Sequence, residues 1–104
     1  MKLLIKADKK TLEQDSYLLY IETPFCGTCH FAKKILEEIE SKFDKELFHE
    51  INASLHPSFM QEAKIESVPC LLIKEKGEIK RRIYTFHSVP FMAREVLAYP
   101  TLIV

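Results

Sequence analysis

Two cysteines, Cys26 and Cys29, stand three positions apart, and His30 follows directly behind them. A C-x-x-C spacing suits a redox pair that alternates between dithiol and disulfide, and it can also supply half of a zinc site. With the histidine, the letters CGTCH match a covalent haem-attachment motif as well. The elements around the pair must decide which of these chemistries the chain supports.

The composition describes a globular protein without a charged bias. The chain has 104 residues, 47% of them hydrophobic, and we expect a single domain over residues 1–104 with one core. Lys and Arg together number 15, as do Asp and Glu. The basic excess of nucleic-acid binders is therefore missing, and we expect no nucleic-acid partner.

The cellular compartment bears on what the cysteines do. The opening letters MKLLIKADKK hold only three adjacent large apolar residues, which predicts neither a signal peptide nor a membrane span. We therefore expect a cytoplasmic protein with no membrane partner. Three cysteines, Cys26, Cys29 and Cys70, are an odd number for a disulfide framework, and the cytosol keeps structural disulfides reduced. Their presence is better explained by reactivity or metal binding.

The apolar pattern predicts alternating strands and helices. Short runs of branched or aromatic residues predict three strands, at 2–7, 17–22 and 46–52. Apolar steps of three and four, together with capping residues, predict helices at 9–15, 27–43, 54–65 and 89–99. Two further strands are expected over 69–86, joined by a tight turn at Lys76 and Gly77. The fold class is α/β, with a central mixed β-sheet and helices on both faces.

This order places the cysteine pair where a strand has ended and a helix begins. The first backbone N–H groups of a helix lack internal partners, and the helix dipole is positive there. A thiolate at that end is stabilised, so we expect the pKa of Cys26 to fall below the free value of about 8.5. Cys26 is the expected exposed nucleophile, and Cys29, one turn further and facing inward, is the expected resolving cysteine.

Three landmarks give the chain a specific resemblance to the thioredoxin family. FCGTC stands where thioredoxins have Trp-Cys-Gly-Pro-Cys, SVPCLLI (67–73) resembles the loop with a cis-proline, and KEKGEI (74–79) matches the hairpin that follows. The resemblance implies the thioredoxin fold, a Cys26–Cys29 disulfide, and a cis Val68–Pro69 bond. It also implies that Pro69 shapes the groove where an extended substrate docks, and the expected substrate-binding residues are Phe25, Gly27, Thr28, Val68 and Cys70.

The resemblance further implies the activity and its partners. The chain is expected to be an enzyme, a protein disulfide oxidoreductase that reduces or exchanges disulfides in protein substrates. It needs no bound cofactor, because the electrons reside in the two sulfurs. A thioredoxin-reductase-like flavoenzyme is the expected electron donor, and the expected oligomeric state is a monomer.

The chain departs from the family at the residues that handle the proton of the second cysteine. Tyr20 occupies the place of a buried aspartate, and Glu50 occupies the place of its lysine partner. A buried Glu50 would have a raised pKa and could accept the Cys29 proton, whereas a Glu50 at the strand edge would simply reach solvent. Cys70, next to the expected cis-proline, is interpreted first as a small apolar residue and otherwise as a third reactive thiol.

Other classes of function are open to the same letters. Haem attachment is disfavoured by the absence of an export signal and by the strand–helix alternation. Zinc or iron–sulfur binding could use Cys26, Cys29 and Cys70, with His30 as a further ligand, but no second spaced ligand pair exists and we expect no metal. A non-catalytic redox sensor or interaction module keeps the fold, and it is favoured by the missing aspartate and the extra Cys70.

Overall fold

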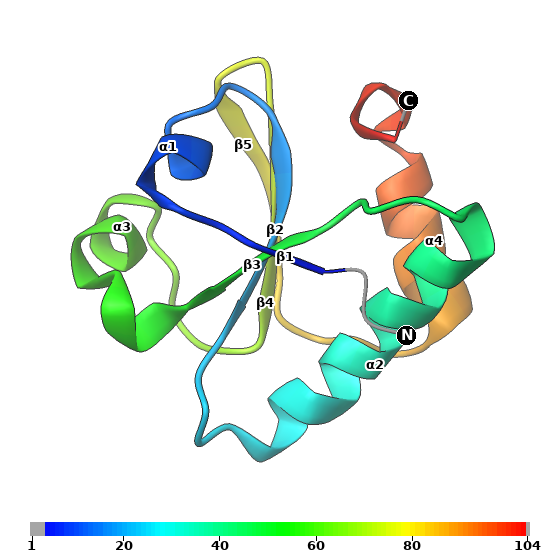
Figure 1. Cartoon of the computed structure of the whole chain (residues 1–104), viewed down its shortest axis with the longest axis horizontal. Helices are drawn as coiled ribbons and strands as arrows, with labels where there is room; N and C mark the ends of the chain where they lie inside the picture. Colours follow the sequence, from blue (N-terminus) through cyan, green and yellow to red (C-terminus); the bar gives the residue numbers. More distant parts are fainter. Residues whose placement is uncertain (1–3, 104) are drawn as a thin grey trace.

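A computed structural model of the chain describes residues 4–103 (Figure 1). Its five strands form one sheet in the order β1-β3-β2-β4-β5. They are β1 (Ile5–Lys6), β2 (Tyr17–Glu22), β3 (His49–Asn52), β4 (Cys70–Glu75) and β5 (Glu78–Ile83). Strands β1, β3 and β2 run parallel, and β4 and β5 pair antiparallel beside them. The expected mixed sheet is confirmed.

Helices cover both faces of this sheet. They are α1 (Lys9–Leu12), α2 (Gly27–Phe43), α3 (Pro57–Glu62) and α4 (Val89–Leu97), with short 3-10 turns η1 (Ala53–Leu55) and η2 (Pro100–Leu102). Helices α2 and α4 lie together on one side of the sheet, and α1 and α3 lie on the other (Figure 1). This arrangement agrees with the predicted layers.

Strand β2 is the centre of the core, because its first five residues are buried. Successive side chains of a strand point to opposite faces. Leu18 and Tyr20 accordingly pack under α2 and α4, while Leu19 and Ile21 pack under α1 and α3. By the same alternation Glu22, the last residue of β2, points toward the α2 side. The uninterrupted apolar run predicted a strand buried on both faces, and the structure agrees.

Several predicted elements are shorter than expected. The helix predicted over 9–15 ends at Leu12 as α1. The helix predicted over 54–65 is divided, because Pro57 disfavours helical geometry at His56, and α3 starts afresh with the proline in its first turn. The strand predicted over 46–52 begins only at His49, because the backbone N–H groups of Leu47 and Phe48 donate to the Glu40 carboxylate at 2.8 and 2.9 Å.

The ends of the chain show smaller differences. The strand predicted at 2–7 is ordered as β1 at Ile5 and Lys6, and residues 2 and 3 of that prediction lie outside the described part. The C-terminal residues Leu102 and Ile103 pack against the α2 and α4 core. The Lys45 ammonium donates to the Ile103 carbonyl at 2.9 Å, which fastens this end to the loop after α2.

The predicted turn between β4 and β5 is present. Lys76 and Gly77 have positive φ angles of 53° and 81°. Two positive φ angles in succession are typical of a type I′ turn, which matches the twist of an antiparallel hairpin. The Gly77 N–H also donates to the Asp15 carbonyl at 2.8 Å, so the hairpin tip is fixed to the segment before β2.

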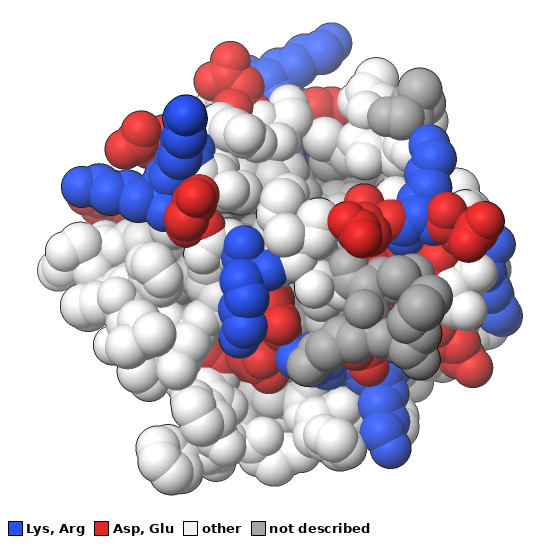
Figure 2. Space-filling model, viewed as in Figure 1, with Lys and Arg blue, Asp and Glu red and all other residues white. Residues whose placement is uncertain are grey.

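The surface mixes both signs of charge. Figure 2 shows Lys and Arg side chains beside Asp and Glu side chains on the same face, with apolar and uncharged residues between them. No helix within residues 4–103 is long and apolar enough to cross a membrane.

Candidate redox site

Cys26 and Cys29 are joined by a disulfide, with their Cα atoms 5.3 Å apart. Cys26 is the N-cap of α2, and its Sγ accepts a hydrogen bond from the Cys29 backbone N–H at 3.1 Å. Cys29 lies in the first turn of α2 and is 1% exposed, whereas Cys26 is only half-buried. The N–H and the helix dipole that meet the Cys26 sulfur here would stabilise its thiolate after reduction.

The surface around Cys26 is open. Phe25 is 96% exposed, and the Thr28 hydroxyl lies 3.6 Å from the Cys26 sulfur. Gly27 is exposed, and no atom lies within 4 Å of the position that a Cβ would take. Phe31, one turn further along α2, is also exposed. A partner can therefore approach the half-buried Cys26 sulfur over a surface that includes the exposed rings of Phe25 and Phe31.

The predicted substrate loop is partly as expected. The Val68–Pro69 peptide bond is cis, as the resemblance implied. Val68 is half-buried and Pro69 is buried. Cys70 is 0% exposed, and its side chain belongs to the core under α1 and α3. The expectation that the Cys70 side chain contacts substrate is therefore wrong, because no part of it reaches the surface.

Burial also determines the chemistry of Cys70. Removal from solvent raises the pKa of this thiol to about 12, although the charge of Arg82 acts in the opposite direction. The thiol is therefore protonated at neutral pH, and it is neither a nucleophile nor a ready ligand for a metal. The structure supports the interpretation of Cys70 as a small apolar residue.

Tyr20 is completely buried, and its hydroxyl donates to the Cys29 backbone carbonyl at 2.6 Å. Its ring meets the Phe86 ring edge-on, with centroids 6.0 Å apart. Burial and the nearby carboxylates Glu22, Glu50 and Glu37 raise the pKa of Tyr20 far above its usual value. Tyr20 thus holds the first turn of α2 in place and has no charged form with which to accept a thiol proton.

Glu50 is buried, but not with the raised pKa that was expected. Its carboxylate lies 2.8 Å from the Lys33 ammonium and 3.7 Å from that of Lys6. Burial alone would raise the pKa, but the hydrogen bond and charge of Lys33, a hydrogen bond with Glu22 and the charge of Lys6 together lower it. The prediction of a raised pKa for Glu50 is wrong, because it did not take into account Lys33 on the facing helix.

The raised pKa belongs instead to Glu22, a residue the sequence reasoning did not single out. The Glu22 carboxylate lies 3.6 Å from the Lys33 ammonium, and its side chain is 21% exposed. Burial raises its pKa; the charge of Lys33 lowers it, and the hydrogen bond and charge of Glu50 raise it further. Two carboxylates therefore share one ammonium, and Glu22 binds a proton more readily than Glu50 does.

A signal for this cluster was present in the sequence. Lys33 stands four positions after Cys29 and so lies on the same face of α2. Glu22 is the acidic end of an otherwise apolar strand, and strand parity directs it toward that helix face. Together, the alternation of the strand and the repeat of the helix predict that Glu22, Lys33 and Cys29 lie close to one another.

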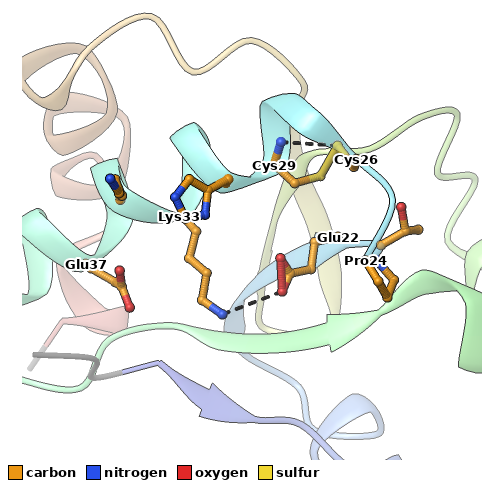
Figure 3. Close-up of a pocket in the computed structure, with 9 residues that line it drawn as sticks. Glu22, Pro24, Cys26, Cys29, Lys33 and Glu37 are labelled. Atoms are coloured by element: carbon orange, nitrogen blue, oxygen red, sulfur yellow. Dashed lines mark hydrogen bonds and ion pairs between the residues drawn. A yellow bond between two sulfur atoms is a disulfide. The ribbon is translucent and has the colours of Figure 1, made fainter.

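A pocket of about 290 Å³ connects these groups with the sulfurs. Figure 3 shows the Glu22 and Lys33 side chains pointing toward one another between β2 and α2, beneath the disulfide. The pocket is lined by Glu22, Thr23, Pro24, Cys26, Cys29, His30, Lys33, Lys34 and Glu37. Glu50, whose carboxylate contacts the Lys33 ammonium, is not among the lining residues.

Within residues 4–103, no group of three or more His, Cys, Asp or Glu side chains is arranged to hold a metal ion. The chemistry that the geometry presents is that of a sulfur pair on a helix end with an ionisable pocket beneath it.

Comparison with known proteins agrees with this geometry. The family model described as thioredoxin matches residues 5–94 of the chain. The chain belongs to the thioredoxin family. The thioredoxin-like protein YusE of Bacillus subtilis (strain 168) is 40% identical to this thioredoxin-family chain over 92 residues, covering 88% of the chain and 87% of that protein.

Solved structures show the same fold at low sequence identity. The thioredoxin from Trypanosoma brucei brucei superimposes with a TM-score of 0.75 at 12% identity, covering 94% of this chain and 91% of that one. The oxidised thioredoxin from Plasmodium falciparum gives 0.74 at 12% identity, with 92% and 97% covered. The predicted thioredoxin fold is confirmed.

Proposed function

We propose that this thioredoxin-family protein is an enzyme, a thiol–disulfide oxidoreductase that reduces or exchanges disulfides in protein substrates through Cys26 and Cys29. The observation that carries the proposal is the position of the Cys26 sulfur, half-buried on the N-terminus of α2 and accepting the Cys29 N–H at 3.1 Å. This position favours a thiolate with a second sulfur one helical turn away.

The proposed reaction has two steps. The Cys26 thiolate attacks one sulfur of a substrate disulfide, which forms a mixed disulfide and releases the other substrate sulfur as a thiolate. Cys29 then loses its proton and attacks the Cys26 sulfur, which releases the second substrate thiolate. Two electrons pass from the protein dithiol to the substrate, and the protein is left with the Cys26–Cys29 disulfide. No bound cofactor takes part.

The substrate approaches over the open surface beside Cys26. Phe25 offers an exposed aromatic ring, and Gly27 and Thr28 leave room for a partner backbone. In the proposal, Pro69 shapes the opposite wall of the groove, and the Val68 backbone pairs with an extended substrate segment. Cys70 takes no part in this contact, because the whole residue is buried.

The proposal extends to the setting of the reaction. The protein acts as a monomeric single domain in the cytoplasm, and a thioredoxin-reductase-like flavoenzyme returns electrons to the disulfide. The charge balance of 15 basic and 15 acidic residues supports a role that needs neither nucleic acid nor an anionic membrane surface.

Insulin reduction distinguishes an enzyme from a redox sensor. With a small dithiol as electron source, the wild-type protein should accelerate the precipitation of reduced insulin chains. Cys26→Ser should abolish the acceleration, and Cys29→Ser should reduce it strongly because mixed disulfides accumulate. Cys70→Ala is the matched control and should retain the wild-type rate. A wild-type protein that forms the Cys26–Cys29 disulfide but gives no acceleration over the dithiol alone would be a sensor or an interaction module.

A further inference from the structure

We propose that Glu22 is the group that accepts the proton of Cys29 during resolution of the mixed disulfide, across the pocket that contains both cysteines. This inference rests on the proposed function, since it assigns a step of the same reaction. The sequence suggested Glu50 as the proton acceptor, and thioredoxins have an aspartate where this chain has Tyr20. The present proposal gives the role to Glu22, at the end of β2.

Access to the sulfurs favours Glu22. Glu22, Cys26 and Cys29 line one pocket of about 290 Å³, whereas Glu50 does not line it. A water molecule occupies about 30 Å³ in the liquid, so this volume admits several waters that can relay a proton between a thiol and a carboxylate. Tyr20 is excluded, because its hydroxyl proton is donated to the Cys29 carbonyl at 2.6 Å.

The charges around Glu22 favour it as well. Lys33 and Glu37 face it from α2, Glu50 from β3 and Lys6 from β1, and His30 and Lys34 complete the pocket wall. Burial and Glu50 raise the pKa of Glu22, while Lys33 lowers it, with a net upward shift. A carboxylate with a raised pKa holds an accepted proton more readily and passes it on to the departing substrate thiolate.

The two carboxylates share the Lys33 ammonium unequally. Lys33 is 2.8 Å from Glu50 but 3.6 Å from Glu22, so the ammonium favours the ionised form of Glu50 more strongly. When Glu22 is protonated, its hydroxyl donates to the Glu50 carboxylate, and Glu50 remains charged. In this scheme Glu50 and Lys33 are positioning residues, and the proton itself is held on Glu22.

The test uses the reaction of the reduced protein with an aromatic disulfide whose thiolate product is coloured, such as 5,5′-dithiobis(2-nitrobenzoate). One equivalent of coloured thiolate is released when Cys26 attacks, and a second when Cys29 resolves the mixed disulfide. Stopped-flow absorbance therefore separates the two steps. Glu22→Gln should leave the first phase unchanged and slow the second by about a hundredfold or more near neutral pH, since about a hundredfold is the lower end of what general acid–base catalysis contributes.

The pH dependence distinguishes proton transfer from a structural effect. The second phase of Glu22→Gln should converge with wild type at high pH, where solvent ionises the Cys29 thiol directly. Glu50→Gln should keep a fast second phase. Its pH profile should shift to lower pH, because loss of the Glu50 charge lowers the pKa of Glu22. Glu38→Gln, which removes an exposed carboxylate from α2, is the matched control and should match wild type.

The outcomes separate this inference from the proposed function. A wild-type protein without a second phase would contradict the disulfide exchange itself. A normal wild-type second phase that Glu22→Gln leaves unchanged at every pH would overturn the assignment of Glu22 alone. Loss of the second phase in Glu50→Gln, with Glu22→Gln normal, would also overturn it and return the role to Glu50.

Discussion

Cys26 uses one atom for two roles, the helix cap that the structure shows and the nucleophile that we propose. Its sulfur caps α2 by accepting the Cys29 N–H, a role that Ser, Thr, Asp or Asn fills in most helices. A thiolate accepts this hydrogen bond better than a thiol does, so the helix end and the charge stabilise one another. Cys29, one turn further, is almost completely buried, so in the proposed reaction its proton leaves through the pocket that both cysteines line.

Individual residues differed in how far they could be predicted. The positions of Cys26 and Cys29 at the start of α2 could be predicted from local spacing, because three positions correspond to about one helical turn. The pairing of Glu22 and Glu50 through Lys33 joins three elements that are far apart in sequence. Only the register of β3 against β2 and the rotation of α2 bring these charges together, so the sign of the Glu50 shift was predicted wrongly.

The burial of Cys70 predicts how its thiol reacts in the native protein. Because its pKa is about 12 and its side chain is fully buried, alkylation of the reduced native protein at pH 8 should modify Cys26 and leave Cys70 untouched. With its pKa at about 12, the thiol stays protonated at any lower pH, so its reactivity should rise only as the pH approaches that value. Peptide mass spectrometry after iodoacetamide treatment checks this, with urea-unfolded protein as the control in which all three cysteines react. Rapid native labelling of Cys70 would contradict its placement in the core.

Helix α2 carries the cysteines at one end and, near its other end, also holds the segment before β3. Its buried Glu40 accepts hydrogen bonds from the Leu47 and Phe48 N–H groups, which fastens the segment that leads into β3. Burial raises the pKa of Glu40, although these two hydrogen bonds lower it in part. Sequence periodicity does not predict this contact, because a buried carboxylate that accepts two backbone N–H groups leaves no periodic pattern.

Glu40→Ala should lower the free energy of unfolding by about 2–4 kcal/mol, because two buried N–H groups would lose their acceptor. Urea denaturation of the oxidised protein measures the loss, and Glu38→Ala on the exposed side of the same helix should change stability by less than about 0.5 kcal/mol. The position of Glu40 at the far end of α2 from the cysteines predicts that a refolded variant keeps its exchange rate. A loss below about 0.5 kcal/mol for Glu40→Ala, no larger than that of an ordinary surface substitution, would contradict the structural role of this carboxylate.

At the scale of the whole molecule, the sheet brings together segments that lie far apart in the sequence. Strands β2 and β4 pair at the centre, with Ile21 opposite Cys70, so the residue before Cys70 comes to the same end of the sheet as the residues that follow β2. The radius of gyration of 12.5 Å agrees with the roughly 13 Å expected of a compact chain of this length. A compact scaffold holds Pro69 and the sulfur pair at one edge.

The order of elements could be predicted from periodicity and turn residues, because each depends on neighbours in the chain. The strand order β1-β3-β2-β4-β5 could not, since pairing depends on which apolar faces meet after collapse. The resemblance to thioredoxins supplied that long-range information through FCGTC and SVPCLLI. Tyr20, which departs from the family pattern, became interpretable only when its hydroxyl was seen to reach the Cys29 carbonyl.

Trapping the mixed disulfide shows directly whether Cys26 is the attacking sulfur. Reduced Cys29→Ser protein is mixed with a disulfide-bonded peptide, quenched with acid and analysed by intact and peptide mass spectrometry. We predict one peptide adduct per protein, attached to Cys26, while Cys26→Ser forms little or no adduct on the enclosed Cys29. An adduct that forms preferentially on Cys29, or no adduct on either sulfur, would contradict the assignment of Cys26 as the attacking group.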